Sequence, residues 1–125
     1  MECSTQTRCR KTENFFKDTA YINWYCTNEH FTASEYIKAN CEYPGNWDGT
    51  IKRIEKVGNL IIAVVNVFTV NKELSFHVVS FIEIEDDKII GMNEYWGDDG
   101  IAPQWRLQKN IGTEITYLSY SFMKD

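Results

Sequence analysis

The sequence has little positive charge. Its 13 lysine and arginine residues are outnumbered by 18 aspartate and glutamate residues, so the chain of 125 residues carries a net charge of −5. Proteins that track a phosphate backbone usually show clustered lysine and arginine, whereas the one basic cluster here, at 8–11, lies in a short polar N-terminus. We therefore expect no nucleic-acid partner, and we expect residues 1–11 to be flexible or atypical.

Histidine is scarce and long apolar runs are missing. The two histidines are far apart, with neither HxH nor HExxH spacing, and no GxSxG nucleophile elbow occurs, so we expect no metal site and no cofactor. The longest apolar run, 60–65, is far too short to cross a membrane, and the N-terminus has no apolar core of a signal sequence. We expect no membrane partner.

The cysteines and the turn-forming residues are also few. The four cysteines, at 3, 9, 26 and 41, show neither the close pairs of a zinc site nor the dense pattern of a secreted disulfide scaffold. Reduced thiols and a cytoplasmic location are the expectation. Two prolines, seven glycines and no repeat leave no linker, and a chain of this length buries about two thirds of its unfolded surface. We therefore expect one domain over 1–125.

The hydrophobic pattern changes period near residue 49. Before it, we expect a short helix over 12–18, a strand over 20–26, a loop over 27–31 and a helix over 32–42, which the capping-box pair Thr32 and Glu35 would open. After it, residues alternate with period two, which predicts sequential antiparallel strands at 50–56, 60–70, 74–85 and 88–96. Helices gathered before a long meander indicate an α+β architecture with a curved sheet.

One acidic residue falls on an apolar strand face. Met92, Glu94 and Trp96 alternate with Asn93 and Tyr95, so Glu94 is expected to point inward. A buried carboxylate is unfavourable unless it is paired, hydrogen-bonded or protonated, and a raised pKa would suit a general acid or base near neutral pH. Two alternatives remain open. The carboxylate could be structural, satisfied by an arginine or a tyrosine hydroxyl, or a β-bulge could exchange it for its neighbours.

Several stretches resemble the nuclear transport factor 2-like superfamily, which includes ketosteroid isomerases and SnoaL-like polyketide cyclases. They are FIEIEDDKIIGMNEYWGD at 81–98 and AYINW at 20–24, while CEYPGNWDG at 41–49 and GDDGIAPQWR at 97–106 look like a bacterial SnoaL-like branch without established activity. The resemblance covers about 12–112. It implies a cone-shaped α+β fold, with N-terminal helices packed on the concave face of a curved antiparallel sheet, around a pocket for a small, largely apolar organic ligand.

The resemblance also assigns positions to individual residues. Where isomerases carry their general base, this chain has Trp24, and the strand position of their oxyanion acid holds Ser80, so the isomerase mechanism is not expected. Glu94 is then the candidate catalytic acid or base, and His30, at the expected pocket rim, is a second proton carrier. His77 alternates with Ser80 and is expected on the outer face. The candidate ligand-binding residues are Trp24, Ser80, Met92 and Trp96.

Two classes of function remain. The first is a small-molecule pocket, either for lyase, isomerase or cyclase chemistry of the acid-base type or for binding alone. The second is a non-catalytic homodimeric module whose cavity is filled by its own tryptophans. A homodimer is implied by the resemblance and by Val79 and Phe81, which fall on the outer sheet face, where a monomer would favour polar residues.

Overall fold

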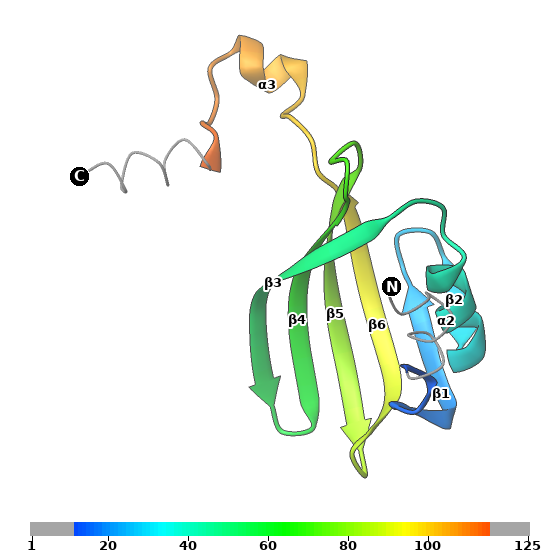
Figure 1. The fold of residues 1–125 in the computed structure, drawn as a ribbon. Coiled ribbons are helices and arrows are strands. Elements are labelled where there is room, and N and C mark those ends of the chain that lie inside the picture. Colours follow the sequence, from blue (N-terminus) through cyan, green and yellow to red (C-terminus); the bar gives the residue numbers. More distant parts are fainter. Residues whose placement is uncertain (1–11, 116–125) are drawn as a thin grey trace.

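The computed structural model describes residues 12–115, and six strands of this part form one curved, open sheet (Figure 1). The spatial order is β2-β1-β6-β5-β4-β3, so β2 and β3 are the edges. The strands are β1 (Phe16–Trp24), β2 (Glu29–Thr32), β3 (Trp47–Val57), β4 (Leu60–Thr69), β5 (Ser75–Glu85) and β6 (Lys88–Asp98).

The last four strands form the expected meander. Each of them pairs antiparallel with the next along the chain, although β3 begins earlier than predicted, at Trp47, and β6 continues to Asp98. The turn between β5 and β6 places Asp86 and Asp87 at φ values of 53° and 64°, the left-handed backbone that suits a two-residue hairpin. The pairing of β5 with β6 shifts register beside this turn, between Glu83 and Ile84. From Glu83 opposite Gly91 to Phe76 opposite Asp98, the pairing is regular.

The sheet is mixed, which corrects the expectation of an antiparallel sheet. Strand β1 pairs with β6 in parallel, with Trp24 opposite Glu94, while β1 and β2 form an antiparallel hairpin. Parallel partners can be far apart in sequence, and the local hydrophobic pattern carries no information on such a pairing. The α+β class is confirmed.

The N-terminal third departs further from the sequence-based assignment. The helix predicted over 12–18 is wrong from residue 16 onward, because the chain there is already strand β1 and the Phe16 side chain is buried in the core. Tertiary packing overrides local helix propensity. The predicted loop at 27–31 is wrong from residue 29, where the short strand β2 begins, and this strand ends at Thr32. The expected flexible N-terminus at 1–11 lies outside the described residues.

Helix α2 (Ala33–Cys41) begins where its capping box predicts. The Glu35 backbone N–H donates to Thr32 Oγ1 at 3.2 Å, and the Thr32 N–H donates to Glu35 Oε1 at 2.9 Å. The helix packs Ile37 against a core that consists of Phe16, Ala20, Ile22, Ile37 and Met92. It therefore covers the β1 and β6 side of one sheet face, while the short helix α3 (Gln104–Gln108) lies beyond the end of the sheet (Figure 1). Packing of the helices on the concave face stays a prediction.

Two findings concern the expectations about membrane spans and cysteines. Within the described part, no helix is both long enough and apolar enough to cross a membrane. Cys41 is disulfide-bonded, so the expectation of reduced cysteines is wrong for this residue. Sequence spacing alone does not tell which cysteines approach to bonding distance in the folded chain. The cytoplasmic location stays a prediction.

Gly91 in β6 allows a close approach of β1. A methyl group built at this position would lie 2.5 Å from the ring of Tyr21, whose hydroxyl donates to Glu83 Oε2 at 3.3 Å. The Tyr21 ring therefore lies directly against Gly91, and there is room for the ring only because glycine has no side chain. Gly97, in the same strand, has nothing within 4 Å of the equivalent position.

Replacing Gly91 by alanine should therefore destabilise the sheet. We expect Gly91→Ala to lower the free energy of unfolding by about 1–3 kcal/mol, because the Tyr21 ring must shift. Gly97→Ala, as the matched control, should leave stability unchanged or raise it by up to about 1 kcal/mol. Urea denaturation of the three proteins measures both differences, and equal stability of the two variants would contradict the prediction.

Candidate functional site

A hollow of about 600 Å³ lies between the sheet and the segments that include α2. We call it the aromatic hollow, after its lining. All six strands supply residues to it, the turn between β1 and β2 supplies two, and α2 with the segment that follows the helix supplies two more. The lining residues of the described chain are Trp24, Cys26, Thr27, Glu29, Asn40, Tyr43, Trp47, Val67, Phe76, Trp96 and Asp98.

The aromatic side chains of this hollow form one continuous arc. Trp24 meets Trp96 with ring centroids 5.8 Å apart, and Trp96 meets Phe76 at 6.3 Å. Phe76 stacks on Trp47 at 5.6 Å, and Trp47 meets Tyr43 edge-on at 5.2 Å. These ring distances match the offset and edge-to-face arrangements that aromatic pairs prefer. The arc crosses the sheet from β1 to β3 and presents an extended apolar wall.

Glu94 lies on the inward face, as the alternation predicts, and is only 4% exposed. Its Oε1 accepts a hydrogen bond from Trp24 Nε1 at 2.9 Å, and its Oε2 accepts one from Ser80 Oγ at 2.5 Å. Both partners stand directly opposite Glu94 in the neighbouring strands, so the three side chains form one cross-strand row. An indole and a serine make these two bonds instead of the arginine or tyrosine hydroxyl expected for a structural carboxylate, while the Tyr36 side chain has a smaller effect on Glu94.

Burial dominates the electrostatics of this carboxylate. It raises the pKa of Glu94 above the ordinary value of 4.5, and the hydrogen bonds from Ser80 and Trp24, with smaller effects of Trp96 and Tyr36, oppose the rise without cancelling it. Burial, then the nearby Glu94 charge, raises the pKa of the Tyr36 hydroxyl. The indole N–H of Trp96 is buried and has no hydrogen-bond partner in the described structure. Glu94 is therefore a buried acid surrounded by donors.

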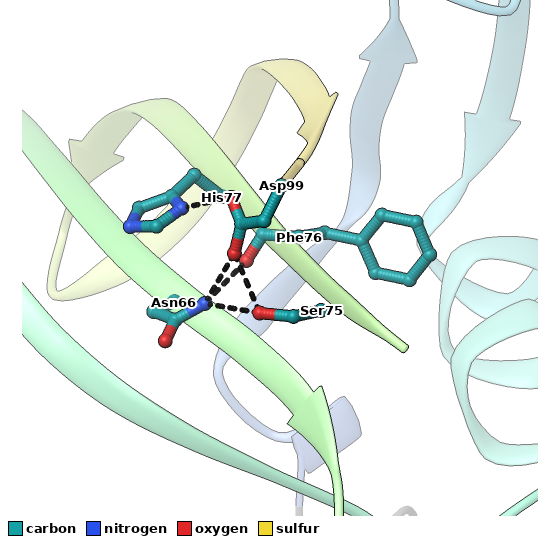
Figure 2. A network of polar contacts seen from close by, with 5 residues as sticks. All are labelled: Asn66, Ser75, Phe76, His77 and Asp99. Atoms are coloured by element: carbon teal, nitrogen blue, oxygen red, sulfur yellow. Dashed lines mark hydrogen bonds and ion pairs between the residues drawn. The ribbon is translucent and has the colours of Figure 1, made fainter. Parts of the chain in front are cut away.

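The opposite face of the sheet carries a polar network behind one wall of the hollow (Figure 2). Asp99, just after β6, accepts from Ser75 Oγ at 2.5 Å, from Asn66 Nδ2 at 3.1 Å, and contacts His77 Nδ1 at 2.5 Å. Asn66 Nδ2 also donates to the Phe76 carbonyl at 2.8 Å, while the Phe76 ring points away from the four polar side chains (Figure 2). The network thus fixes the backbone of a residue whose ring lines the aromatic hollow.

The network also lowers the pKa of Asp99. The slight burial of this carboxyl raises its pKa, but the hydrogen bonds from Ser75 and His77, with the charge of His77, outweigh that effect. The pKa therefore lies below its ordinary value. His77 lies on the outer face, opposite in direction to Ser80, as the alternation predicts. The network and Glu94 lie on opposite faces of the sheet.

No protein-family model and no curated protein matches the sequence. Among solved structures, a candidate ketosteroid isomerase from Kribbella flavida DSM 17836 superposes with a TM-score of 0.72 at 20% identity, over 89% of this chain and 80% of that chain. The chain has the nuclear transport factor 2-like fold. A protein of that fold and of unknown function from Burkholderia xenovorans LB400 has a TM-score of 0.68 at 21% identity, covering 90% and 86% of the two chains.

A third neighbour represents the SnoaL-like group. It is a candidate SnoaL-like polyketide cyclase from Shewanella putrefaciens CN-32, with a TM-score of 0.59 at 13% identity over 74% of this chain and 71% of that chain. At sequence identities this low, the structural similarity establishes the nuclear transport factor 2-like fold alone. The resemblance read from the strand motifs is confirmed at that level.

On this fold, the structure separates the residues that the sequence grouped as one site. Trp24 and Trp96 line the aromatic hollow, whereas Ser80, Met92 and Glu94 are not among its lining residues. Met92 belongs to the core beneath α2, and Ser80 is buried against Glu94. The two tryptophans therefore stand between the hollow and the carboxylate that one of them binds. The catalytic and binding roles of these residues stay predictions.

His30 does not join Glu94. It is exposed in strand β2, with Nδ1 2.7 Å from Asn23 Oδ1 and its ring stacked on Tyr21 at 6.4 Å. Asn23 and Tyr21 flank Ile22 in β1, whose side chain is fully buried in the core, so His30 lies on the face opposite to Glu94. Within residues 12–115, no group of three or more histidine, cysteine or acidic side chains is placed to hold a metal ion.

Sequence reasoning missed several lining residues. Phe76 shares the inward alternation of Val78 and Ser80, so its position could have been predicted. Trp47 and Tyr43 could not, because their placement depends on the turn after α2, where Gly45 has a φ of 101° and Trp47 Nε1 donates to the Pro44 carbonyl at 2.8 Å. The convergence of β1, β3, β5 and β6 on one hollow is a property of the whole sheet.

The raised pKa of Glu94 predicts how stability depends on pH. In the folded protein this carboxyl keeps its proton to a higher pH than in the unfolded chain, so wild-type stability falls as pH rises through the interval above 4.5. Glu94→Gln has no proton to lose, and its amide can accept from Trp24 and donate to the Ser80 oxygen. Its stability relative to wild type should therefore increase across that interval and level off above the folded pKa.

Denaturation at a series of pH values, together with carboxyl ¹³C NMR of Glu94, measures this effect. Ser80→Ala should raise the pKa of Glu94 further, because a hydrogen bond that favours the ionised form is lost. A constant stability difference between wild type and Glu94→Gln over this pH range would contradict the prediction.

Proposed function

We propose that the protein binds a small, largely apolar organic molecule in the aromatic hollow. The observation that carries the proposal is the hollow itself, about 600 Å³ in volume and walled by the continuous arc of five aromatic rings. Ligand sites usually have volumes of roughly 300–1,000 Å³, with apolar and aromatic walls and a few polar groups. The neighbours described as a candidate ketosteroid isomerase and a candidate SnoaL-like polyketide cyclase support the same class of ligand.

Binding is favoured over acid-base catalysis by the position of Glu94. A general acid or base must reach the proton that it transfers, directly or through one water. Both oxygens of Glu94 already accept hydrogen bonds, and Trp24, one of the two donors, is itself a wall of the hollow. We therefore propose that Glu94 orients the Trp24 indole. Lyase, isomerase or cyclase chemistry remains the second candidate, supported by the raised pKa of Glu94.

Binding in the aromatic hollow can be tested with a neutral fluorescent probe, N-phenyl-1-naphthylamine. Val67 lines the hollow, whereas Val57, at the end of β3, is 63% exposed and is not among the lining residues. Val67→Trp should fill the hollow and weaken probe binding by about tenfold or more, because several contacts with the rings are lost. Val57→Trp, the matched control, should bind the probe as wild type does. Equal loss in both variants, or no binding to wild type, would contradict the proposal.

We also propose that the protein is a homodimer whose subunits meet through the outer sheet face. Tyr25 and Tyr95 stack there at 5.0 Å, Phe81 meets Tyr95 edge-on at 6.1 Å, and the two tyrosines are 51% and 45% exposed. Val79, directly opposite Tyr95 in the sheet, extends this patch. Contiguous apolar surface of this kind usually marks an interaction site.

The oligomeric state follows from light scattering after size-exclusion chromatography at micromolar concentration. We expect a dimeric mass for wild type and a monomeric mass for Tyr95→Lys, because a charge would be buried without a partner in the interface. Val70→Lys, at an exposed position just after β4, is the control and should remain dimeric. A monomeric wild-type protein would refute the proposal.

A further inference from the structure

We infer that the aromatic hollow selects an organic cation, that is, an amine or quaternary ammonium group joined to an apolar body. The inference deepens the proposed function and rests on it. It is carried by two properties of the lining that occur together, the arc of aromatic rings and the sign of the charged side chains at the rim.

The arc supplies a surface that attracts positive charge. The face of an aromatic ring is negative, and a cation within about 6 Å of the ring centre is attracted to it, most strongly by tryptophan. Three of the five rings in the arc are tryptophans, and their neighbours are Phe76 and Tyr43. The centroids of successive rings are 5.2–6.3 Å apart, so one small cationic group can contact more than one ring.

The rim carries negative charge alone. Glu29 in β2 and Asp98 at the end of β6 are the charged residues among the described lining, which includes no lysine, arginine or histidine. Glu29 Oε1 accepts from Thr27 Oγ1 at 2.6 Å, which orients one carboxylate beside the hollow. Both side chains are exposed, so they can attract a cation from solvent without being buried unpaired.

The same lining disfavours an anion. An anionic ligand would meet two carboxylates beside electron-rich aromatic rings, and the described lining offers no cation to pair with it. An uncharged apolar ligand would gain from contact with the rings but nothing from Glu29 and Asp98. The geometry therefore ranks ligands of equal shape in the order cation, neutral molecule, anion.

Three probes of similar shape test this order by displacing N-phenyl-1-naphthylamine. They are phenyltrimethylammonium, tert-butylbenzene and benzenesulfonate, which share a phenyl ring and a tetrahedral head group and differ in charge. We expect phenyltrimethylammonium to bind about tenfold more tightly than tert-butylbenzene. Benzenesulfonate should bind more weakly than either.

Two rim variants then locate the source of the preference. Asp98→Asn and Glu29→Gln, made singly and together, should reduce the affinity for the cation more than that for tert-butylbenzene, by about fivefold in the double variant. Asp87→Asn removes the same charge from the turn at the opposite end of the β5–β6 hairpin and is the matched control. It should leave the ratio of the two affinities unchanged.

The outcomes separate this inference from the proposed function. Equal affinity for the cation and its neutral analogue, or tighter binding of the anion, would overturn the cation preference while the hollow would remain a ligand site. An equal effect of Asp87→Asn and the rim variants would also overturn it, because the preference would then come from net charge alone. Binding of none of the probes would contradict both.

Discussion

The structure depends on a row of three side chains in which Glu94 is held between Trp24 and Ser80. These residues stand opposite one another in β1, β6 and β5, and the row therefore crosses the one parallel pairing of the sheet. A buried carboxylate without donors would be strongly unfavourable, but here each oxygen has one. The row consequently fixes the register of three strands and the orientation of Trp24, the first ring of the aromatic arc.

The aromatic hollow is supported from both sides of the sheet. On the inner side, Glu94 determines how the Trp24 indole is presented. On the outer side, Asp99 joins Asn66, Ser75 and His77, and Asn66 holds the backbone of Phe76. Polar groups that do not touch the hollow therefore determine the positions of two of its walls, as rigid binding sites require.

Much of this arrangement follows from local patterns in the sequence, and part of it does not. The meander, the capping box at Thr32 and the inward position of Glu94 depend on neighbouring residues, and period and capping predict them. The start of β1, its parallel pairing with β6 and the meeting of Trp47 with Phe76 depend on residues distant in the chain. The sequence identified Trp24 and Trp96 as pocket residues but could not separate them from Glu94, because alternation gives the face of a side chain and not its depth.

The pairing of β1 with β6 has a consequence for how the protein is made. Trp24 and Glu94 are 70 residues apart, and about two thirds of the described chain lies between them. Contacts between distant residues form slowly, because a long loop must close first. A growing chain on the ribosome therefore exposes β1 and its aromatic side chains until β6 has been synthesised, and no fragment that lacks either strand can form the hollow.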